Sequence, residues 1–402
     1  MLLTMMRYAL GFYVLFFPLG ISLREAGAVT SFVCLVAYYI LDWRDSNLRR
    51  FPLKWLFFGF LALLILKTLH TTHFDASWYA LRTNFYKGPM LLLAGLEAVR
   101  KPKHLRALAW PFVIMTFYSG LDGIYQQITK VDFFFGMSES GRLNAMWETG
   151  RIGNLMSLTI PVCFALPLLL PRRWSLATRL TVTALVAFPG LFLWVGAKAR
   201  SGWFGLVTGM VALAWLSRGK RSAVLVLVLA AVVMVLAASV FPRQLALERL
   251  MDAPRFIIWQ AAIDVWKAHP LLGAGVDCFE PAYKALGIVF DPKIFDPPIP
   301  HPHNVYLQFL AETGVVGTVV LLAFLGGNAA WGGLRLRARI KAGQLDPQWL
   351  GACFWAAEVG YMVTAFTAHD FYRTWWLGMS MFVTGLALGA ALGRWEQDGG
   401  ES

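Results

Sequence analysis

The feature that most limits the fold of this chain is the length of its apolar blocks. Runs of hydrophobic residues recur between charged, Pro- or Gly-containing segments, and roughly seventeen or more residues in a helix can cross about 30 Å of hydrocarbon. Hydrophobic residues make up 58% of the 402 residues and charged residues 15%, against about 25% charged in soluble domains. The sequence therefore predicts an all-α polytopic membrane protein and excludes a soluble globular one.

The apolar blocks predict about twelve transmembrane helices. We expect the first block to be a retained span rather than a cleaved signal peptide. The spans divide the chain into helices one to nine (1–241), a large outer loop containing short helices (242–303), helices ten to twelve (304–393) and a tail (394–402). The expected spans lie near 8–22, 27–41, 53–69, 84–99, 107–127, 152–170, 178–196, 201–216, 222–241, 304–330, 349–368 and 372–393.

The basic residues orient these spans. The net charge is +13, which in a soluble protein would suggest nucleic acid. One set of alternate loops, however, holds eighteen Lys or Arg and the short loops of the other set hold eight. Because cytoplasmic loops are enriched in Lys and Arg, the first set and both termini are predicted to be cytoplasmic, and no nucleic acid is expected. The first set comprises 42–54, 100–106, 171–179, 217–221 and 335–341.

The outer loop contains a helix signal between Pro254 and Ala268. Proline suits the first helical position, and aromatic or branched residues then recur at spacings of three or four. This pattern predicts a helix that lies along the membrane surface or caps a cavity, or one that is simply packed outside the membrane. Its repeating residues are Phe256, Trp259, Ile263 and Trp266.

The sharpest chemical signal is the run His301-Pro302-His303-Asn304. Asn304 is a good N-cap for the next span, so His303 is expected just outside a helix N-terminus. The partial positive charge there disfavours imidazolium, and a neutral ring is a candidate general base. The alternatives are two interfacial histidines bonded to loop backbone, or two metal ligands. No acidic cluster or third histidine completes a metal site, and the four cysteines form no CxxC pair.

Several arginines are expected on the outer side, where topology predicts few cations. Arg151, Arg200 and Arg373 each stand at the start of a span, and Arg255 lies in the first turn of the loop helix. A cation near a helix N-terminus opposes the helix dipole, so this pattern indicates a nearby anion, such as a phosphate held by bidentate bonds. The alternative is that each side chain only snorkels to the interface.

Weaker signals flank these motifs. Gln308 and Glu312 share a helix face with the N-cap, which favours interhelical hydrogen bonds or a wet cavity. His369-Asp370 is a loop dipeptide that could orient a catalytic group, and Lys198 could add affinity for phosphate.

Together these motifs resemble the integral-membrane O-antigen ligase and O-antigen polymerase superfamily. The resemblance rests on HPHN-x3-Q-x3-E-x-G at 301–314, Pro254-Arg255-x3-Trp259, the run HPLLGAG at 269–275 and the run KARSG at 198–202, in family order. The architecture resembles that of C-type glycosyltransferases. It implies glycosyl transfer from a polyprenyl diphosphate donor at the outer face of the inner membrane.

In the ligase case, the resemblance implies transfer of O-antigen from undecaprenyl diphosphate to the lipid A–core oligosaccharide, which completes lipopolysaccharide. The reaction is expected to be metal-independent, to invert the anomeric centre and to need no cofactor. The protein would be a multi-pass inner-membrane enzyme in contact with membrane lipid, with a periplasmic active site. The implied residues are His303 as base, Arg200, Arg255 and, by location, Arg151 for the diphosphate, and His301, Asn304, Trp259 and, by location, Asp370 in support.

Other functions remain open at this point. O-antigen polymerase and protein O-oligosaccharyltransferase use the same kind of donor with different acceptors, which the motifs do not encode. A transporter is suggested by the many spans and by the polar face with Gln308 and Glu312. Against transport, the polar residues gather at the outer face and no paired repeats are evident. The overall pattern, with one large outer loop that ends at HPHN, favours an O-antigen ligase among these functions.

Overall fold

The computed structural model describes residues 1–137, 141–147, 151–240, 253–295, 298–343, 346–368 and 373–393. Every regular element in these residues is helical. The elements are α1 (Leu2–Leu15), α2 (Ile21–Asp42), η1 (Trp43–Asp45), α3 (Asn47–Arg50), α4 (Lys54–Leu69), α5 (Phe74–Ala80), η2 (Leu81–Phe85), α6 (Lys87–Ala98), α7 (Pro102–Thr129), α8 (Ile152–Cys163), α9 (Leu166–Leu169), α10 (Leu176–Gly196), α11 (Arg200–Arg218), α12 (Lys220–Val240), α15 (Ala253–Ala268), α16 (Phe279–Ala285), α17 (Val305–Lys341), α18 (Asp346–Thr364) and α19 (Thr374–Leu392).

The predicted all-α fold is confirmed, and a helix overlaps each predicted apolar block. The boundaries differ at the first block, where α1 ends at Leu15 and α2 already begins at Ile21, and at the tenth block, where α17 runs on to Lys341. Of the helices in the described residues, five are long and apolar enough to cross a membrane. The total of about twelve spans stays a prediction. The five are Ile21–Asp45, Pro102–Thr129, Leu176–Gly196, Val305–Lys341 and Trp375–Leu392.

Glycines set the close packing of the central helices. A Cβ atom on Gly360 of α18 would lie 2.2 Å from the carbonyl oxygen of Gly205 in α11, and one on Gly209 would lie 2.7 Å from that of Ala356. Small residues at helix crossings let backbones approach closely in membrane proteins, where association depends on van der Waals packing. Close packing of glycines also joins α11 to α8, where the backbone of Gly202 lies against that of Gly153.

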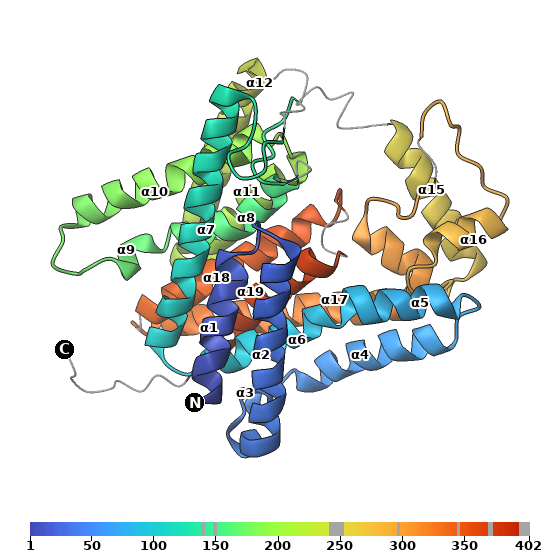
Figure 1. Ribbon diagram of the computed structural model, residues 1–402, viewed down its shortest axis with the longest axis horizontal. Helices are drawn as coiled ribbons and strands as arrows, with labels where there is room; N and C mark the ends of the chain where they lie inside the picture. Colours follow the sequence, from blue (N-terminus) through green and yellow to red (C-terminus); the bar gives the residue numbers. More distant parts are fainter. Residues whose placement is uncertain are drawn as a thin grey trace.

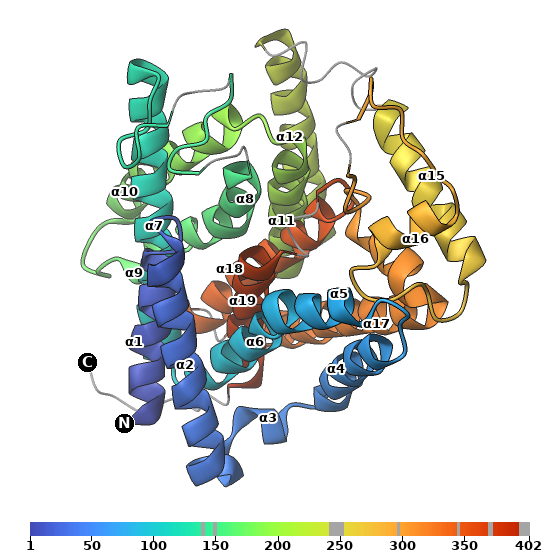
Figure 2. The same cartoon turned by 45° about the vertical axis from the view of Figure 1, so that its right-hand side comes forward.

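The helices of the segment that follows α12 gather on one side of the molecule. Helices α15 and α16 lie near α4 and α5, whereas α9 and α10 lie on the opposite side (Figure 1, Figure 2). The predicted loop helix is confirmed as α15, and it packs against α16 and α17. Its buried side chains are Ile258, Ala261, Ala262 and Val265.

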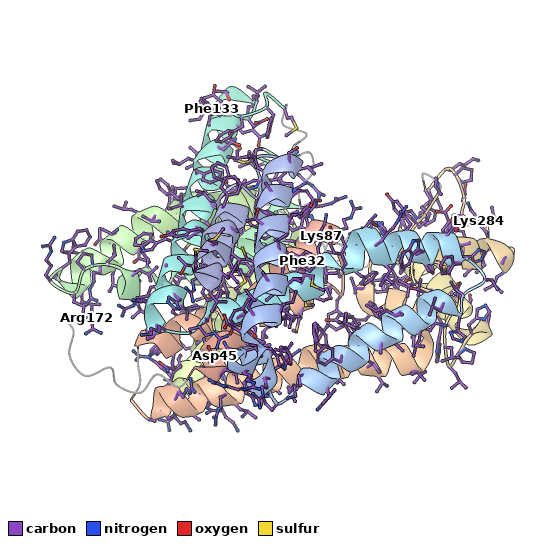
Figure 3. The ribbon with its side chains drawn as sticks, turned by 60° about the horizontal axis from the view of Figure 1, so that its bottom comes forward. Phe32, Asp45, Lys87, Phe133, Arg172 and Lys284 are labelled. Atoms are coloured by element: carbon purple, nitrogen blue, oxygen red, sulfur yellow. The ribbon has the colours of Figure 1, made fainter. Side chains whose placement is uncertain are left out.

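Helix α19 connects two ends of the bundle that differ in their side chains. It begins after Arg373 and ends at Leu392, and 19 residues of helix are about 28 Å long. We call its first end the histidine end, after His301 and His303, and its last end the basic end, after Arg50, Arg100 and Arg335. Figure 3 shows where Asp45 of the basic end lies, far from Phe133, which follows the end of α7.

Candidate functional site

The HPHN motif forms a compact turn at the start of α17. The rings of His301 and His303 lie 4.5 Å apart, centroid to centroid, at an interplanar angle of 83°. The Asn304 side chain accepts hydrogen bonds from the backbone N–H groups of Tyr306 (3.0 Å) and Leu307 (3.1 Å), so the predicted N-cap is confirmed. His303 has φ 54°, a left-handed conformation that is costly for a residue with a side chain. The turn therefore holds His303 in a conformation that a free chain would avoid.

The loop helix binds directly to this turn. Trp259 of α15 donates a hydrogen bond from Nε1 to the carbonyl oxygen of Pro302, at 3.0 Å. The residue that the aromatic pattern singled out thus contacts the proline between the two histidines. Trp266, one of the other aromatic residues in the pattern, donates instead to the carbonyl oxygen of Pro270 at 3.2 Å. Helix α15 is anchored at both positions, and Trp259 ties it to the histidine turn.

Burial and nearby arginines lower the pKa of both histidines. Burial lowers the pKa of His303 below its ordinary value, and the positive charges of Arg255, Arg373 and Arg151 lower this pKa further. Burial likewise lowers the pKa of His301 to about 3, with further lowering from the charges around it. The neutral His303 ring that the sequence predicts is thus supported. Its pKa is lowered first by burial and then by the arginine charges, whereas the sequence pattern points to the helix N-terminus as the cause.

The three arginines come from separate parts of the chain. Arg151 is the N-cap residue of α8, Arg373 is the N-cap residue of α19, and Arg255 lies in the first turn of α15. Each therefore stands at a helix N-terminus, as the sequence pattern predicted. The structure brings these positive charges together around the histidine turn, where helix N-termini and guanidinium groups both favour an anion.

The start of α11, where Arg200 lies, packs against the start of α8. Arg200 is the first residue of α11, whose Gly202 packs on Gly153 of α8 so closely that an added Cβ atom would lie 2.5 Å from the Gly153 carbonyl oxygen. Ser201 also donates to the side chain of Asn154 at 2.7 Å. The N-termini of α8 and α11, with Arg151 and Arg200, are thus joined.

The sequence favours hydrogen bonds between helices for Glu312. In the structure its carboxylate instead binds the segment between α15 and α17. Its buried carboxylate accepts hydrogen bonds from the backbone N–H groups of Asp277 (2.8 Å) and Phe279 (3.3 Å) and from Nε2 of Gln308 (2.9 Å). Two of these donors belong to the segment between α15 and α17. The polar face of α17 therefore holds the segment between α15 and α17 in place.

A break in α17 completes this anchorage. Gly314 has φ 64°, which opens the helical hydrogen bonds around it. The exposed groups bind the HPLLGAG run: the Val315 N–H donates to the Pro270 carbonyl oxygen at 3.0 Å, and the Ala274 N–H donates to that of Ala311 at 3.0 Å. Glycine is required at this position, because a Cβ atom on Gly314 would lie 2.3 Å from the Leu271 carbonyl group. The end of the 301–314 motif and the HPLLGAG run at 269–275 are thus hydrogen-bonded to each other.

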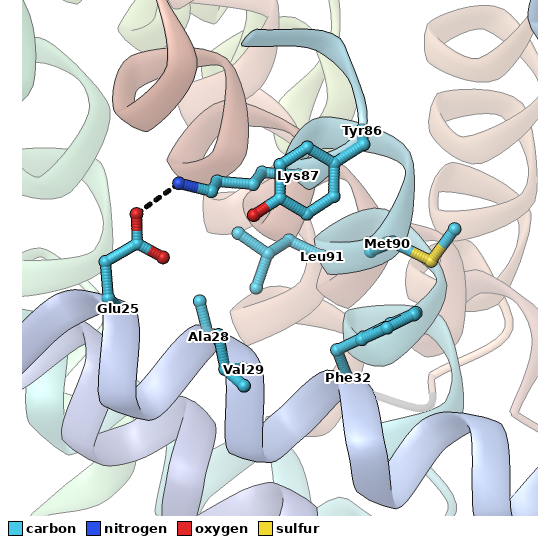
Figure 4. A pocket seen from close by; sticks show the side chains of 8 residues that line it. All are labelled: Glu25, Ala28, Val29, Phe32, Tyr86, Lys87, Met90 and Leu91. Carbon is cyan, nitrogen blue, oxygen red and sulfur yellow. Dashed lines mark hydrogen bonds and ion pairs between the residues drawn. The ribbon is translucent and has the colours of Figure 1, made fainter. Parts of the chain in front are cut away.

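Two further cations, Arg24 and Lys87, lie beside the start of α19, and no sequence motif singles them out. Arg24 is 8% exposed, and its guanidinium lies 4.9 Å from the ring centroid of Trp375, which follows the N-cap residue of α19 by two positions. Lys87 lies 4.0 Å from the ring centroid of Trp375 and forms an ion pair with Glu25 above an apolar pocket between α2 and α6 (Figure 4). The short loop that the sequence predicts at 22–26 is wrong, because Arg24 and Glu25 lie near the start of α2.

Some predicted residues fall outside the described part of the chain. Asp370 and its neighbour His369 are among them, so the role of Asp370 stays a prediction. Lys198 donates from Nζ to the carbonyl oxygen of Gly141 at 2.6 Å and so supports a loop. Within the described ranges, no group of three His, Cys, Asp or Glu side chains is placed to hold a metal ion.

Comparison with known proteins bears on this geometry. Residues 185–322 match a family model described as O-antigen ligase. The matched segment runs from within α10 to within α17 and includes Arg200, Arg255 and both histidines of the turn. No curated protein matches the chain.

Proposed function

We infer the function of this chain from its membership of the O-antigen ligase/polymerase superfamily, to which the match over residues 185–322 assigns it. It is a multi-pass membrane protein of a family that carries out glycosyl transfer. Our proposal is that it is an O-antigen ligase of the bacterial inner membrane. It would transfer the glycan from undecaprenyl diphosphate to the lipid A–core oligosaccharide at the periplasmic face.

The observation that supports this proposal best is the turn of two histidines among three arginines. A diphosphate is a good leaving group once its growing negative charge is stabilised, and preorganised cations supply that stabilisation. Arg151, Arg255 and Arg373 supply it in this proposal, and Arg200 extends the cationic surface through α11. Because arginines perform this task, the reaction needs no metal ion.

The chemical step then requires one base. The acceptor hydroxyl oxygen attacks the anomeric carbon and forms a new C–O bond, while the bond to the diphosphate oxygen breaks and the diphosphate leaves with the electron pair. The hydroxyl proton passes to a ring nitrogen of His303, a contribution of about 10²–10⁴-fold in rate. Attack opposite the leaving group inverts the anomeric carbon.

The arginines also couple the basicity of His303 to donor binding. Before the donor arrives, their charges oppose a proton on the ring. A bound diphosphate brings negative charge to the same arginines, so the ring becomes a better base when a leaving group is in place. Donor binding would therefore prepare the site for the acceptor.

One experiment tests the proposed function. Purified protein in nanodiscs is given a polyprenyl diphosphate-linked glycan and lipid A–core acceptor, and the products are separated by gel and mass. Formation of lipopolysaccharide supports a ligase, a lengthened donor would identify a polymerase, and transfer to a protein acceptor would identify an O-oligosaccharyltransferase. Movement of the donor across the bilayer without bond formation would identify a transporter.

The His303→Ala variant supplies the matched test of the site. Transfer should fall by about 10²–10⁴-fold while donor binding persists, because the arginines remain. The His73→Ala variant is the control, because this exposed histidine lies in a loop on the same predicted side and has no role in the proposed step. A near-normal transfer rate in His303→Ala would show that His303 is not the base.

A further inference from the structure

The basic end of the bundle contains a second cationic site, which glycosyl transfer does not use. A cavity of about 580 Å³ is lined there by Arg50, Arg100 and Arg335, together with Asn47 and Leu392. Its size lies within the usual range of about 300–1,000 Å³ for ligand pockets. Three arginines on one cavity indicate an anionic ligand.

The arginines converge from segments that are far apart in the sequence. Arg50 ends α3, Arg100 follows α6, and Arg335 lies near the end of α17. The positive-inside rule accounts for the number of basic residues in such loops, but it does not require three of them to line one cavity. Their convergence is a property of the packed structure.

Acidic side chains offset this charge only in part. Asp45 pairs with Arg50 at 3.3 Å and with Arg100 at 3.7 Å, and buried Glu97 also pairs with Arg100. Arg335 is exposed. The three arginines therefore keep an excess positive charge over the two carboxylates.

The last turn of α19 also borders the cavity, and a helix C-terminus by itself would repel an anion. Arg339 offsets this effect, because its guanidinium donates to the carbonyl oxygens of Ala390 (3.0 Å) and Leu392 (3.4 Å). Asn47 is held in the wall by hydrogen bonds from Nδ2 to the carbonyl oxygens of Leu96 (2.7 Å) and Val99 (3.2 Å). Hydrogen bonds thus hold two parts of the cavity wall, Asn47 and the end of α19.

We propose that this cavity binds a phosphate group, as the headgroup of an anionic phospholipid or as free phosphate. Arg50 and Arg335 would donate to the phosphate, whereas Arg100, whose N–H groups already donate to Asp45, Tyr38 and Glu97, would contribute its positive charge. Guanidinium groups match phosphate oxygens in bidentate geometry. The position favours a lipid source, because α19 places the cavity about 28 Å along its axis from the histidine end. That distance is close to the hydrocarbon thickness of about 30 Å, so the cavity would lie at the level of the headgroups.

The test measures binding and does not depend on transferase activity. Full-length protein in a nonionic detergent is titrated with dioctanoyl phosphatidylglycerol, dioctanoyl phosphatidylcholine or inorganic phosphate, with thermal shift and native mass spectrometry as readouts. We expect one equivalent of phosphatidylglycerol to bind and to raise the melting temperature, with less effect from phosphatidylcholine. An equal effect of inorganic phosphate would support the site and identify free phosphate as its ligand.

Substitutions then assign the binding to the cavity. Arg335→Gln should weaken phosphatidylglycerol binding about tenfold, as expected for the loss of one charge-assisted interaction, and Arg50→Gln should act in the same direction. Arg173→Gln is the control: this exposed residue adjoins Arg172, which Figure 3 shows far from Asp45. Binding of none of the three compounds, or equal binding by the Arg335 variant and the control, would overturn the proposal.

Discussion

Nε1 of Trp259 donates a hydrogen bond to the carbonyl oxygen of Pro302 at 3.0 Å, and this bond joins the loop helix to the turn that holds both histidines. Trp259→Phe removes the donor and keeps an aromatic ring. We expect the transfer rate to fall about fivefold to tenfold, because a hydrogen bond of about 1 kcal/mol no longer fixes the turn. The measurement is initial rate in the nanodisc assay.

Trp266→Phe is the control for this change, because it removes a similar bond, to Pro270, at the other end of α15. Equal rates for the two variants would show that the Trp259 contact does not position the histidine turn.

The second prediction concerns the pH dependence of transfer. Since the pKa of His303 is lowered from 6.5 and the neutral ring is the active form, kcat/KM should fall only when the pH drops below 6.5. The profile of kcat should have a higher midpoint, because bound diphosphate offsets the arginine charges. These two profiles report the free enzyme and the substrate complex, respectively.

Removing one cation should shift the first midpoint. Arg373→Gln takes away a charge that lowers the pKa of His303, so the midpoint of kcat/KM should move to higher pH. Exposed Arg142, on the same predicted side, provides the control, and its glutamine variant should leave the midpoint in place. A midpoint that stays unchanged in Arg373→Gln would contradict the proposed electrostatic coupling.

The third prediction tests the broken helix. Gly314→Ala should destabilise the protein by about 2–5 kcal/mol, because the left-handed backbone and the close Leu271 carbonyl group both oppose a side chain. Thermal melting in detergent measures the change. In the same helix, Gly326 has nothing within 4 Å of an added Cβ atom, so Gly326→Ala should leave the melting temperature unchanged or slightly raised. An unchanged melting temperature in Gly314→Ala would show that the break in α17 can accommodate a side chain.

The fourth prediction concerns Glu312. In Glu312→Gln the side-chain amide replaces one carboxylate oxygen, so a backbone N–H of the loop loses its charged acceptor, at a cost of about 1.5–3 kcal/mol. We expect a lower melting temperature and faster proteolysis between 269 and 278. The control is Glu280→Gln, which breaks only a surface pair with Lys284 (2.6 Å) that is worth less than about 1 kcal/mol. Similar proteolysis of both variants would argue against the anchoring role.

Much of the fold was predictable because it depends on local patterns. Apolar length predicted where the helices lie, and the aromatic spacing predicted α15. Boundaries were less predictable: α1 and α2 meet within a single apolar stretch, where hydropathy does not change at the turn.

The candidate site was predictable residue by residue but not as an arrangement. The sequence alone determined that Asn304 caps a helix and that arginines stand at helix starts, because caps and termini depend on neighbours within a few positions. Only the tertiary structure decided that Arg255, Arg373 and Arg151 act on His303, and that Glu312 binds a loop. Those contacts join segments far apart in the chain, and they follow from how closely the helices pack, which glycines such as Gly153 and Gly314 set through backbone approach.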